Sequence, residues 1–168
     1  MKRALVILLL LCMITSCKLF SDKPRFYIAT PDGWHRTDTI QERGDTVVRL
    51  NLPQGVLTNE IWKSIAILVT HEYDNDPQKD KLLEQLKNDA DFFEKTGSGH
   101  RVIDGIRAYW FQINVRYKSW QVNCTQRHYF VPKNGFVYTF ICTAPKNDFE
   151  MMRPQVDEVL NSFKILDQ

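Results

Sequence analysis

Two β-forming runs separated by a short turn most constrain what this chain can fold into. Residues 121–131 and 136–143 are rich in β-branched and aromatic side chains, and Pro132-Lys133-Asn134-Gly135 stands between them. An Asn-Gly pair between such runs favours a β-hairpin, because both residues tolerate the positive φ that a tight hairpin turn requires. The sequence therefore predicts two antiparallel strands joined by a four-residue loop.

Four further segments have the composition and periodicity of strands. Residues 45–52 alternate between polar and apolar positions, as expected for a strand with one buried face. Residues 62–73 contain the run SIAILVT, which is nearly all apolar and predicts a strand covered on both faces. Two more β-rich runs cover residues 26–30 and 107–120. Together with the hairpin, these segments predict about six strands.

A central segment has helical periodicity instead. Asp76 can cap a helix and Pro77 can occupy its first turn. Apolar residues then recur on one helical face as far as Lys95, at Leu82, Leu83, Leu86, Ala90 and Phe93. Gly97-Ser98-Gly99 follows and would end the helix, so we expect about five helical turns over residues 76–95.

A second helix is predicted near the C-terminus. Asn147 and Glu150 have the spacing of a capping box, and apolar residues follow at helical intervals. Pro154 leaves two possibilities open, because proline is tolerated in a first turn but bends a helix interior. Either a single turn precedes a helix that starts afresh at Pro154, or one helix is kinked there.

The order of these elements resembles that of the PsbP/DcrB-like family. The segments that carry the resemblance are FYIATPDGW before the sheet, VIDGIRAYWFQINV after the central helix, and LNSFKIL at the end of the last helix. The resemblance covers roughly Phe26 to Leu166. It implies an α+β fold, in which an antiparallel sheet of about six strands has helices on its faces as an α/β/α sandwich. Members include a photosystem II extrinsic subunit, DcrB-type lipoproteins and secretion chaperones, and the resemblance implies no shared catalytic residues.

The N-terminal segment has the layout of a secretory signal peptide. The apolar run over residues 4–14 would rise only about 16 Å as a helix, roughly half the thickness of a bilayer's hydrocarbon core. Lys2 and Arg3 precede the run, and small residues follow it. We therefore expect export of the chain and removal of this segment.

A cysteine stands directly after those small residues. Ile14-Thr15-Ser16-Cys17 resembles the bacterial lipobox, in which the cysteine is acylated and becomes the first residue. We expect residues 1–16 to be a lipoprotein signal peptide, 17–24 a lipidated tether, and 25–168 a single PsbP/DcrB-like domain. The alternative is an ordinary signal peptide that ends near a cysteine. Lipidation at Cys17 would place the protein in the bacterial envelope, on the periplasmic or surface face of a membrane.

The net charge gives no reason to expect a nucleic-acid partner. The whole chain has a formal charge of +2, and Lys2 and Arg3 account for that surplus. The remaining basic residues are scattered rather than clustered. The partners expected are therefore a membrane, through the N-terminal lipid, and an envelope protein.

The two cysteines that would remain besides Cys17 lie on the two arms of the predicted hairpin. Cys124 and Cys142 come close to facing positions if the loop covers residues 132–135. In an oxidising compartment this closeness favours a cross-strand disulfide. The alternative is two buried thiols in neighbouring registers.

Tyr117 and Trp120 are the candidate partner contacts. Trp120 follows Tyr117-Lys118-Ser119 at a junction between two predicted strands. An aromatic residue exposed at such a junction is typical of interface hot spots. Packing of Trp120 in the core is the favoured alternative, because an aromatic residue in a β-rich run is more often buried than exposed.

The sequence offers no catalytic or metal-binding motif. The four histidines are far apart, and none belongs to a zinc-binding pair. We expect no catalytic residue, no metal and no cofactor. The leading hypothesis is a non-catalytic lipoprotein that binds a partner protein or acts as an assembly factor or chaperone. The alternatives are a carrier of a small apolar ligand and a hydrolase using dispersed acids such as Asp74 and Asp104.

Overall fold

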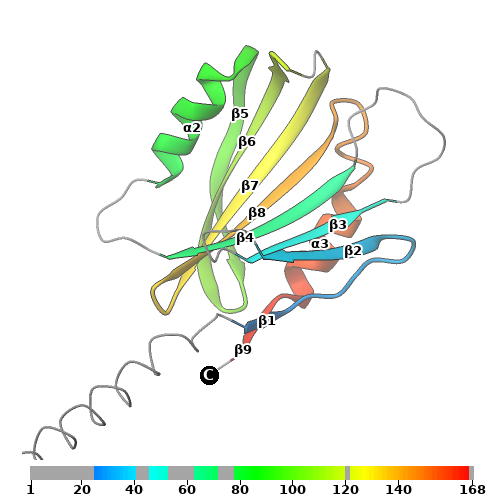
Figure 1. Ribbon diagram of the computed structural model, residues 1–168, viewed down its shortest axis with the longest axis vertical. Helices are drawn as coiled ribbons and strands as arrows, with labels where there is room; N and C mark the ends of the chain where they lie inside the picture. The colour runs from blue at the N-terminus through cyan, green and yellow to red at the C-terminus, as the bar shows by residue number, and fades with distance from the viewer. Residues whose placement is uncertain (1–24, 41–45, 53–62, 72–77, 120–121, 167–168) are drawn as a thin grey trace, which may run out of the picture.

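The computed structural model describes residues 25–40, 46–52, 63–71, 78–119 and 122–166 (Figure 1). These residues form nine strands and two helices. The elements in chain order are β1 (Arg25–Tyr27), β2 (His35–Ile40), β3 (Thr46–Asn51), β4 (Ser64–His71), α2 (Gln78–Asn88), β5 (Ala90–Ile103), β6 (Ile106–Tyr117), β7 (Asn123–Lys133), β8 (Phe136–Pro145), α3 (Arg153–Ser162) and β9 (Lys164–Leu166). Neither helix in this described part is long and apolar enough to cross a membrane.

Seven of the strands form one antiparallel sheet in the order β2-β3-β4-β8-β7-β6-β5. β1 and β9 form a separate two-stranded sheet at one end of the molecule (Figure 1). The long hairpins β5-β6 and β7-β8 make up more than half of the large sheet. Their pairings run nearly the full length of each strand, and two bulges interrupt the first of them.

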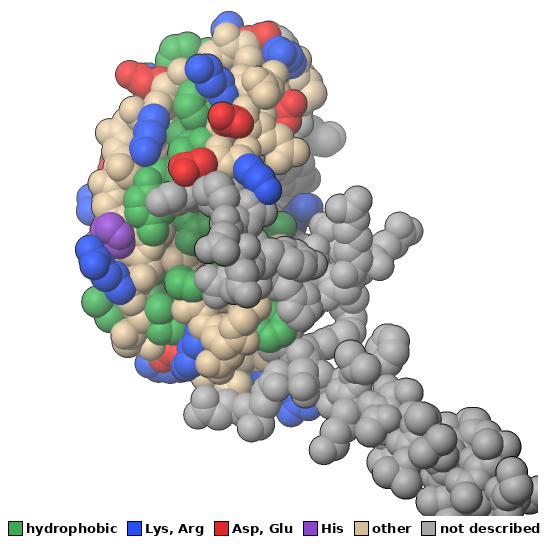
Figure 2. Space-filling model, turned by 90° about the vertical axis from the view of Figure 1, so that its left-hand side faces the viewer, with side chains coloured by type: hydrophobic (Ala, Val, Ile, Leu, Met, Phe, Trp, Pro, Cys, Tyr) green, Lys and Arg blue, Asp and Glu red, His purple; other side chains and the backbone are tan. Residues whose placement is uncertain are grey.

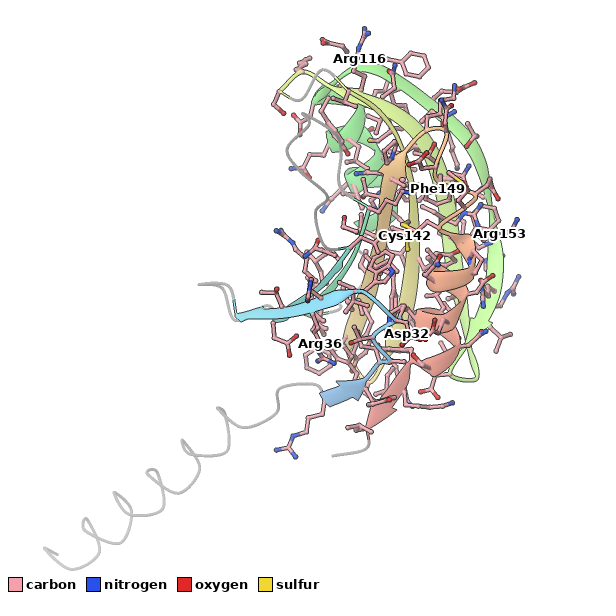
Figure 3. All side chains as sticks on the ribbon, turned by 90° about the vertical axis from the view of Figure 1, so that its right-hand side faces the viewer. Asp32, Arg36, Arg116, Cys142, Phe149 and Arg153 are labelled. Carbon is pink, nitrogen blue, oxygen red and sulfur yellow. The ribbon has the colours of Figure 1, made fainter. Side chains whose placement is uncertain are left out.

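The two helices cover opposite faces of the sheet, as Figure 3 shows from the side. α3 buries Val156, Val159 and Leu160 in the larger hydrophobic cluster. α2 packs three leucines against the smaller cluster on the other face, at Leu82, Leu83 and Leu86. Because successive residues of a strand point to opposite faces, β6 contributes Ala108 to the first cluster and Phe111 to the second. The α+β class and the expected layering of helices on both faces are therefore confirmed.

Aromatic packing joins α3, the large sheet and the small sheet. The ring of Phe163, just after α3, lies 5.0 Å from the ring of Phe140 and 5.4 Å from that of Tyr138, measured between centroids. The ring of Phe26 in β1 packs against the same group, with its centroid 5.7 Å from that of Phe163. These edge-on and tilted contacts are favourable arrangements for aromatic rings, so they hold β1 and α3 on the sheet.

The predicted hairpin is present, but its loop is shorter than expected. Lys133 pairs with Phe136, which leaves only Asn134 and Gly135 in the turn. Both have positive φ, 55° and 76°, as a two-residue hairpin turn requires. The loop therefore contains two residues rather than four.

This shorter loop changes the register and removes the predicted disulfide. Cys124 pairs with Pro145, and Cys142 pairs with Arg127. The two cysteines are free and buried, and they belong to hydrophobic clusters on opposite faces of the sheet. A bridge between them is therefore incompatible with this pairing, and the structure agrees with the alternative of two buried thiols.

The central helix is shorter than the sequence predicts. α2 ends at Asn88, and Lys95 and Gly97-Ser98-Gly99 lie inside β5 rather than at a helix end. The pairing of β5 with β6 overrides the local helical pattern, because it supplies backbone hydrogen bonds along almost the whole strand. The expected helix start at Asp76 and Pro77 lies outside the described residues.

The structure decides between the two possibilities for the last helix. A turn from Asp148 to Met152 comes first, with the Met152 N–H donating to the Asp148 carbonyl at 3.2 Å. α3 then starts afresh at Arg153 with Pro154 in its first turn. The Asn147 capping box is not used, because Met152 occupies the N-cap position.

Three strands were not predicted, namely β2, β5 and β9. β4 also differs from expectation, since only one of its faces is fully buried. Ile65, Ile67 and Val69 are buried, whereas the residues between them are half-buried.

Candidate binding site

A pocket of about 320 Å³ lies where the end of α2 meets the end of β6. Its lining residues are Asn88, Asp89, Tyr117, Lys118 and Ser119. Two hydrogen bonds fix the walls to each other. The ammonium of Lys118 donates to the carbonyl of Asn88 at 2.7 Å, and the Lys118 backbone N–H donates to the carbonyl of Asp89 at 3.1 Å. The structure thus places the predicted contact residue Tyr117 in this pocket, whereas Trp120 lies outside the described residues.

Tyr117 connects the pocket to a polar network inside the α2 face of the sheet. Its hydroxyl donates to Oε1 of Gln126 at 2.8 Å, and Nε2 of Gln126 donates to Oγ1 of Thr143 at 3.3 Å. Nε2 of His128 lies 3.2 Å from the same Gln126 oxygen. The network spans β6, β7 and β8, so it fixes the Tyr117 ring relative to three strands.

His128 is the most enclosed member of this network. The residue is 1% exposed, and its ring stacks on Phe111 with centroids 4.7 Å apart. Burial lowers the pKa of His128 from 6.5 to about 3, so the imidazole is neutral near pH 7. Its Nδ1 has no hydrogen-bond partner among the described residues.

Burial also holds Tyr117 and the Cys124 thiol in their neutral forms. Burial raises the pKa of Tyr117 to about 12, and burial likewise raises the pKa of the Cys124 thiol to about 12. General acid–base chemistry requires a pKa near the working pH, and nucleophilic cysteine chemistry requires a thiolate. The arrangement is therefore suited to hydrogen bonding and packing.

Aromatic rings continue from this network to the edge of the sheet. Measured between ring centroids, Phe111 lies 5.7 Å from Phe130, and Phe130 lies 6.3 Å from Tyr109. The Tyr109 ring in turn lies 5.6 Å from the exposed His100 of β5. The ammonium of Lys95 donates to the Tyr109 hydroxyl at 3.4 Å. Figure 2 shows hydrophobic side chains running down this side of the molecule with charged side chains around them.

Solved structures of other proteins share this architecture, although searches by sequence find no match. No protein-family model matches the chain, and no curated protein matches it. Among solved structures, LpqN of Mycobacterium tuberculosis, described as involved in cell envelope biogenesis, has a TM-score of 0.63 and 18% identity over 88% of both chains. CyanoP, the cyanobacterial PsbP of Synechocystis sp. PCC 6803, has a TM-score of 0.56 and 14% identity over 85% of this chain and 92% of that one. PA94 of Pseudomonas aeruginosa, a protein of unknown function, has a TM-score of 0.57 and 15% identity over 86% of this chain and 99% of that one.

The chain has a PsbP-like fold. The fold resemblance predicted from the sequence is therefore confirmed. At identities of 14–18%, these likenesses concern the fold alone. Residue roles in this PsbP-like domain have to be argued from its own side chains.

Of the two acids considered for a hydrolase, the structure describes only Asp104. Asp74 lies outside the described residues. Asp104 sits in the β5-β6 turn, where its carboxylate accepts hydrogen bonds from Lys164 and from the Ile165 N–H, each at 3.0 Å. Within the described part of the chain, no group of three or more His, Cys, Asp or Glu side chains could hold a metal ion.

Sequence reasoning missed the network formed by Gln126, His128 and Thr143. One signal was available, because Cys124, Gln126, His128 and Phe130 alternate along one strand and must share a face. Two buried polar residues on an otherwise apolar face indicate a hydrogen-bonded network. The partners on β6 and β8 could not be named, since they depend on the strand registers.

Proposed function

We propose that the protein is a lipid-anchored bacterial envelope protein whose PsbP-like domain binds a partner protein without catalysing a reaction. The observation that carries this proposal is the structural likeness to LpqN over 88% of each chain, since LpqN is involved in cell envelope biogenesis. The lipobox-like residues that end in Cys17 support the same location.

The partner contact is proposed at the Tyr117 pocket and at Trp120, which follows Ser119 in the sequence. The pocket is open, and its walls combine an aromatic ring with an acid, a base and two neutral polar side chains. Such mixed, rigidly held surfaces are typical of protein interfaces. The neutral states of His128, Cys124 and Tyr117 support a binding role rather than a catalytic one.

The anchor can be tested with Cys17→Ser. We expect the native protein to carry acyl chains on an N-terminal Cys17 and to sediment with membranes after cell lysis. The variant should keep its leader uncleaved and lack the acyl mass in intact-protein mass spectrometry. A native protein of unacylated mass would contradict the proposal.

The partner site can be tested by photo-crosslinking in cells. A photoreactive residue at Ser119, on the pocket wall, should give a discrete crosslinked product, and Trp120→Ala in the same chain should reduce it. The matched control is the same photoreactive residue at Met151, which is 64% exposed and lies in the turn before α3. Equal products from both positions, or none from Ser119, would argue against a partner at this pocket.

A carrier of a small apolar ligand is the second candidate. The observation in its favour is the pocket volume of about 320 Å³, which is at the lower end of the range for ligand sites. Native mass spectrometry of the purified protein should then show a copurifying molecule that Tyr117→Phe or Ser119→Tyr displaces. A single unliganded mass would count against this candidate.

A further inference from the structure

The described domain begins at the same end of the molecule as β9 and the β5-β6 turn (Figure 1). β1 pairs with β9, which places Arg25 opposite Leu166 and Tyr27 opposite Lys164. The turn is attached to β9 through Asp104, whose two carboxylate oxygens accept from the Lys164 ammonium and from the Ile165 N–H. We call this surface the anchor end and define it by Arg25, Tyr27, Val102, Arg107, Lys164 and Leu166.

Three exposed apolar side chains belong to the strands that meet at the anchor end. Val102 is 68% exposed, Tyr27 56% and Leu166 46%. Among the described residues, two other large hydrophobic side chains are comparably exposed, namely Phe92 and Met151. Exposed apolar groups that concentrate at one end of a domain indicate a contact surface.

Basic side chains lie on the same strands as these apolar groups or on a strand paired with them. Arg107 is paired with Val102 across the β5-β6 ladder, and Arg25 and Lys164 lie in the small sheet. Lys133, at the neighbouring hairpin turn, has its ammonium 4.0 Å from Asp104. The carboxylate of the β5-β6 turn, Asp104, is only 14% exposed and is already engaged by Lys164. The anchor end therefore presents positive charge to solvent and fits an anionic surface.

The tether limits how far this surface can lie from the bilayer. Residues 17–24 are eight in number and can span at most about 28 Å when fully extended. The tether also contains Lys18, Asp22 and Lys23, so its side chains carry one net positive charge. A short tether holds the domain at a high effective concentration near the headgroups, so weak contacts suffice for docking.

We propose that the anchor end docks onto anionic lipid headgroups of the membrane that holds the protein. Arg25, Arg107 and Lys164 contact the phosphates, and Tyr27, Val102 and Leu166 lie at the headgroup boundary, where aromatic and apolar groups bind. This inference rests on the proposed lipid anchor at Cys17. It also fixes the orientation of the domain, because β6 starts at the anchor end and finishes at Tyr117, roughly 35–40 Å farther along the strand. The Tyr117 pocket then faces away from the membrane.

The test uses the full lipidated protein reconstituted into vesicles. A Val102→Cys variant is labelled with a fluorophore and compared in phosphatidylcholine vesicles with and without one quarter phosphatidylglycerol, with a nitroxide quencher on the headgroups. Cys124 and Cys142 stay unlabelled in the folded protein, because both thiols are buried. The matched control carries the label at Met151→Cys. Met151 precedes the N-terminus of α3, whereas the C-terminus of α3 leads into β9 at the anchor end.

We expect headgroup quenching at Val102→Cys in the anionic vesicles and none at Met151→Cys. Reversing one charge with Arg107→Glu should weaken the docked state roughly tenfold, as judged by the quenched fraction.

Flotation of the vesicles separates the docking proposal from the anchor proposal. Protein that floats with vesicles but shows no quenching at Val102→Cys overturns the docking surface and leaves the anchor intact. Protein that does not float overturns both. Quenching that is equal in both kinds of vesicle and rises with protein density points to a second copy of the chain and also overturns lipid docking.

Discussion

At the scale of single residues, His128 couples the stability of the domain to pH. The ring lies against Phe111 and within hydrogen-bond distance of Gln126, in surroundings that exclude water. In the unfolded chain the imidazole has its ordinary pKa near 6.5, whereas burial lowers the pKa in the folded state to about 3. Between these values the unfolded state binds one more proton, so folding becomes less favourable as the pH falls.

A His128→Leu variant should therefore lose much of its acid sensitivity. From pH 6.5 to 4.5, the free energy of unfolding of the native protein should fall by about 2 kcal/mol more than that of the variant. Chemical denaturation at several pH values measures this difference. Carboxylates begin to titrate in this range, but they are the same in both proteins, so their contribution cancels in the comparison. Parallel curves for the two proteins would show that His128 does not carry the effect.

The two buried cysteines give a second prediction at this scale. Burial raises the pKa of both Cys124 and Cys142 to about 12, so almost no thiolate forms at pH 8. In the folded protein their reaction with a maleimide should be on the order of a thousandfold slower than that of an exposed cysteine. Denaturation without reductant should release two reactive thiols from the mature chain. Release of none would mean that the cysteines are bridged and that the register of β7 and β8 is different.

At the scale of elements, two glycines of β5 pack closely against a tryptophan of β6. A Cβ on Gly99 would lie 3.2 Å from the indole of Trp110, and one on Gly97 would lie 3.4 Å from it. The Arg127 guanidinium also packs on that indole, 5.0 Å from the ring centroid. The close fit leaves no room for a branched side chain at residue 99.

Gly99→Val should therefore destabilise the domain by about 1–3 kcal/mol, because the added methyl groups displace the Trp110 ring. Ser98→Val is the matched control, since Ser98 is exposed and valine suits a strand. Urea denaturation should show a lower midpoint for Gly99→Val and an almost unchanged midpoint for Ser98→Val. Equal midpoints would mean that the indole can move aside at little cost.

The same region shows what could be predicted from the sequence. The periodic residues that suggested a long helix do share one environment, because Leu82, Leu83, Leu86, Ala90 and Phe93 all pack in the cluster on the α2 face. The pattern therefore identified the buried face correctly. It could not show that the chain changes from helix to strand after Asn88, since that change depends on pairing with β6, which is distant in sequence.

At the scale of the whole molecule, the strand registers limit what the sequence can predict. The hairpin and the fold class followed from local signals, namely turn residues and alternation. Of the candidate site, Tyr117 was named from the sequence, but the network behind it was not. The Gln126–Thr143 hydrogen bond and the separation of Cys124 from Cys142 both depend on a loop of two residues rather than four. A small change in a turn thus decides which side chains meet across the sheet.

Asp104 connects the small sheet to the large one, and its removal tests how far the two sheets act as a unit. The hydrogen bond from the Ile165 N–H lowers the pKa of the Asp104 carboxyl below its ordinary value of 3.8, and Lys164 acts in the same direction. The stabilisation is therefore present above pH 3.8 and is lost as the pH falls through the folded-state pKa. Asparagine tolerates the positive φ of 49° at this position, so Asp104→Asn removes the charge and keeps the turn.

We expect Asp104→Asn to lower the free energy of unfolding by about 1 kcal/mol at neutral pH, because a carboxylate is a stronger acceptor than an amide. The loss should be concentrated in the small sheet. Hydrogen exchange should become faster at Ile165, while amides in the centre of β7 should change only as far as the global stability does. The matched control is Asp38→Asn, since Asp38 is exposed on β2 and its carboxylate pairs with Arg36 of the same strand. If exchange at Ile165 is the same in both variants, β9 is held by the aromatic contacts of Phe26 and Phe163 rather than by Asp104.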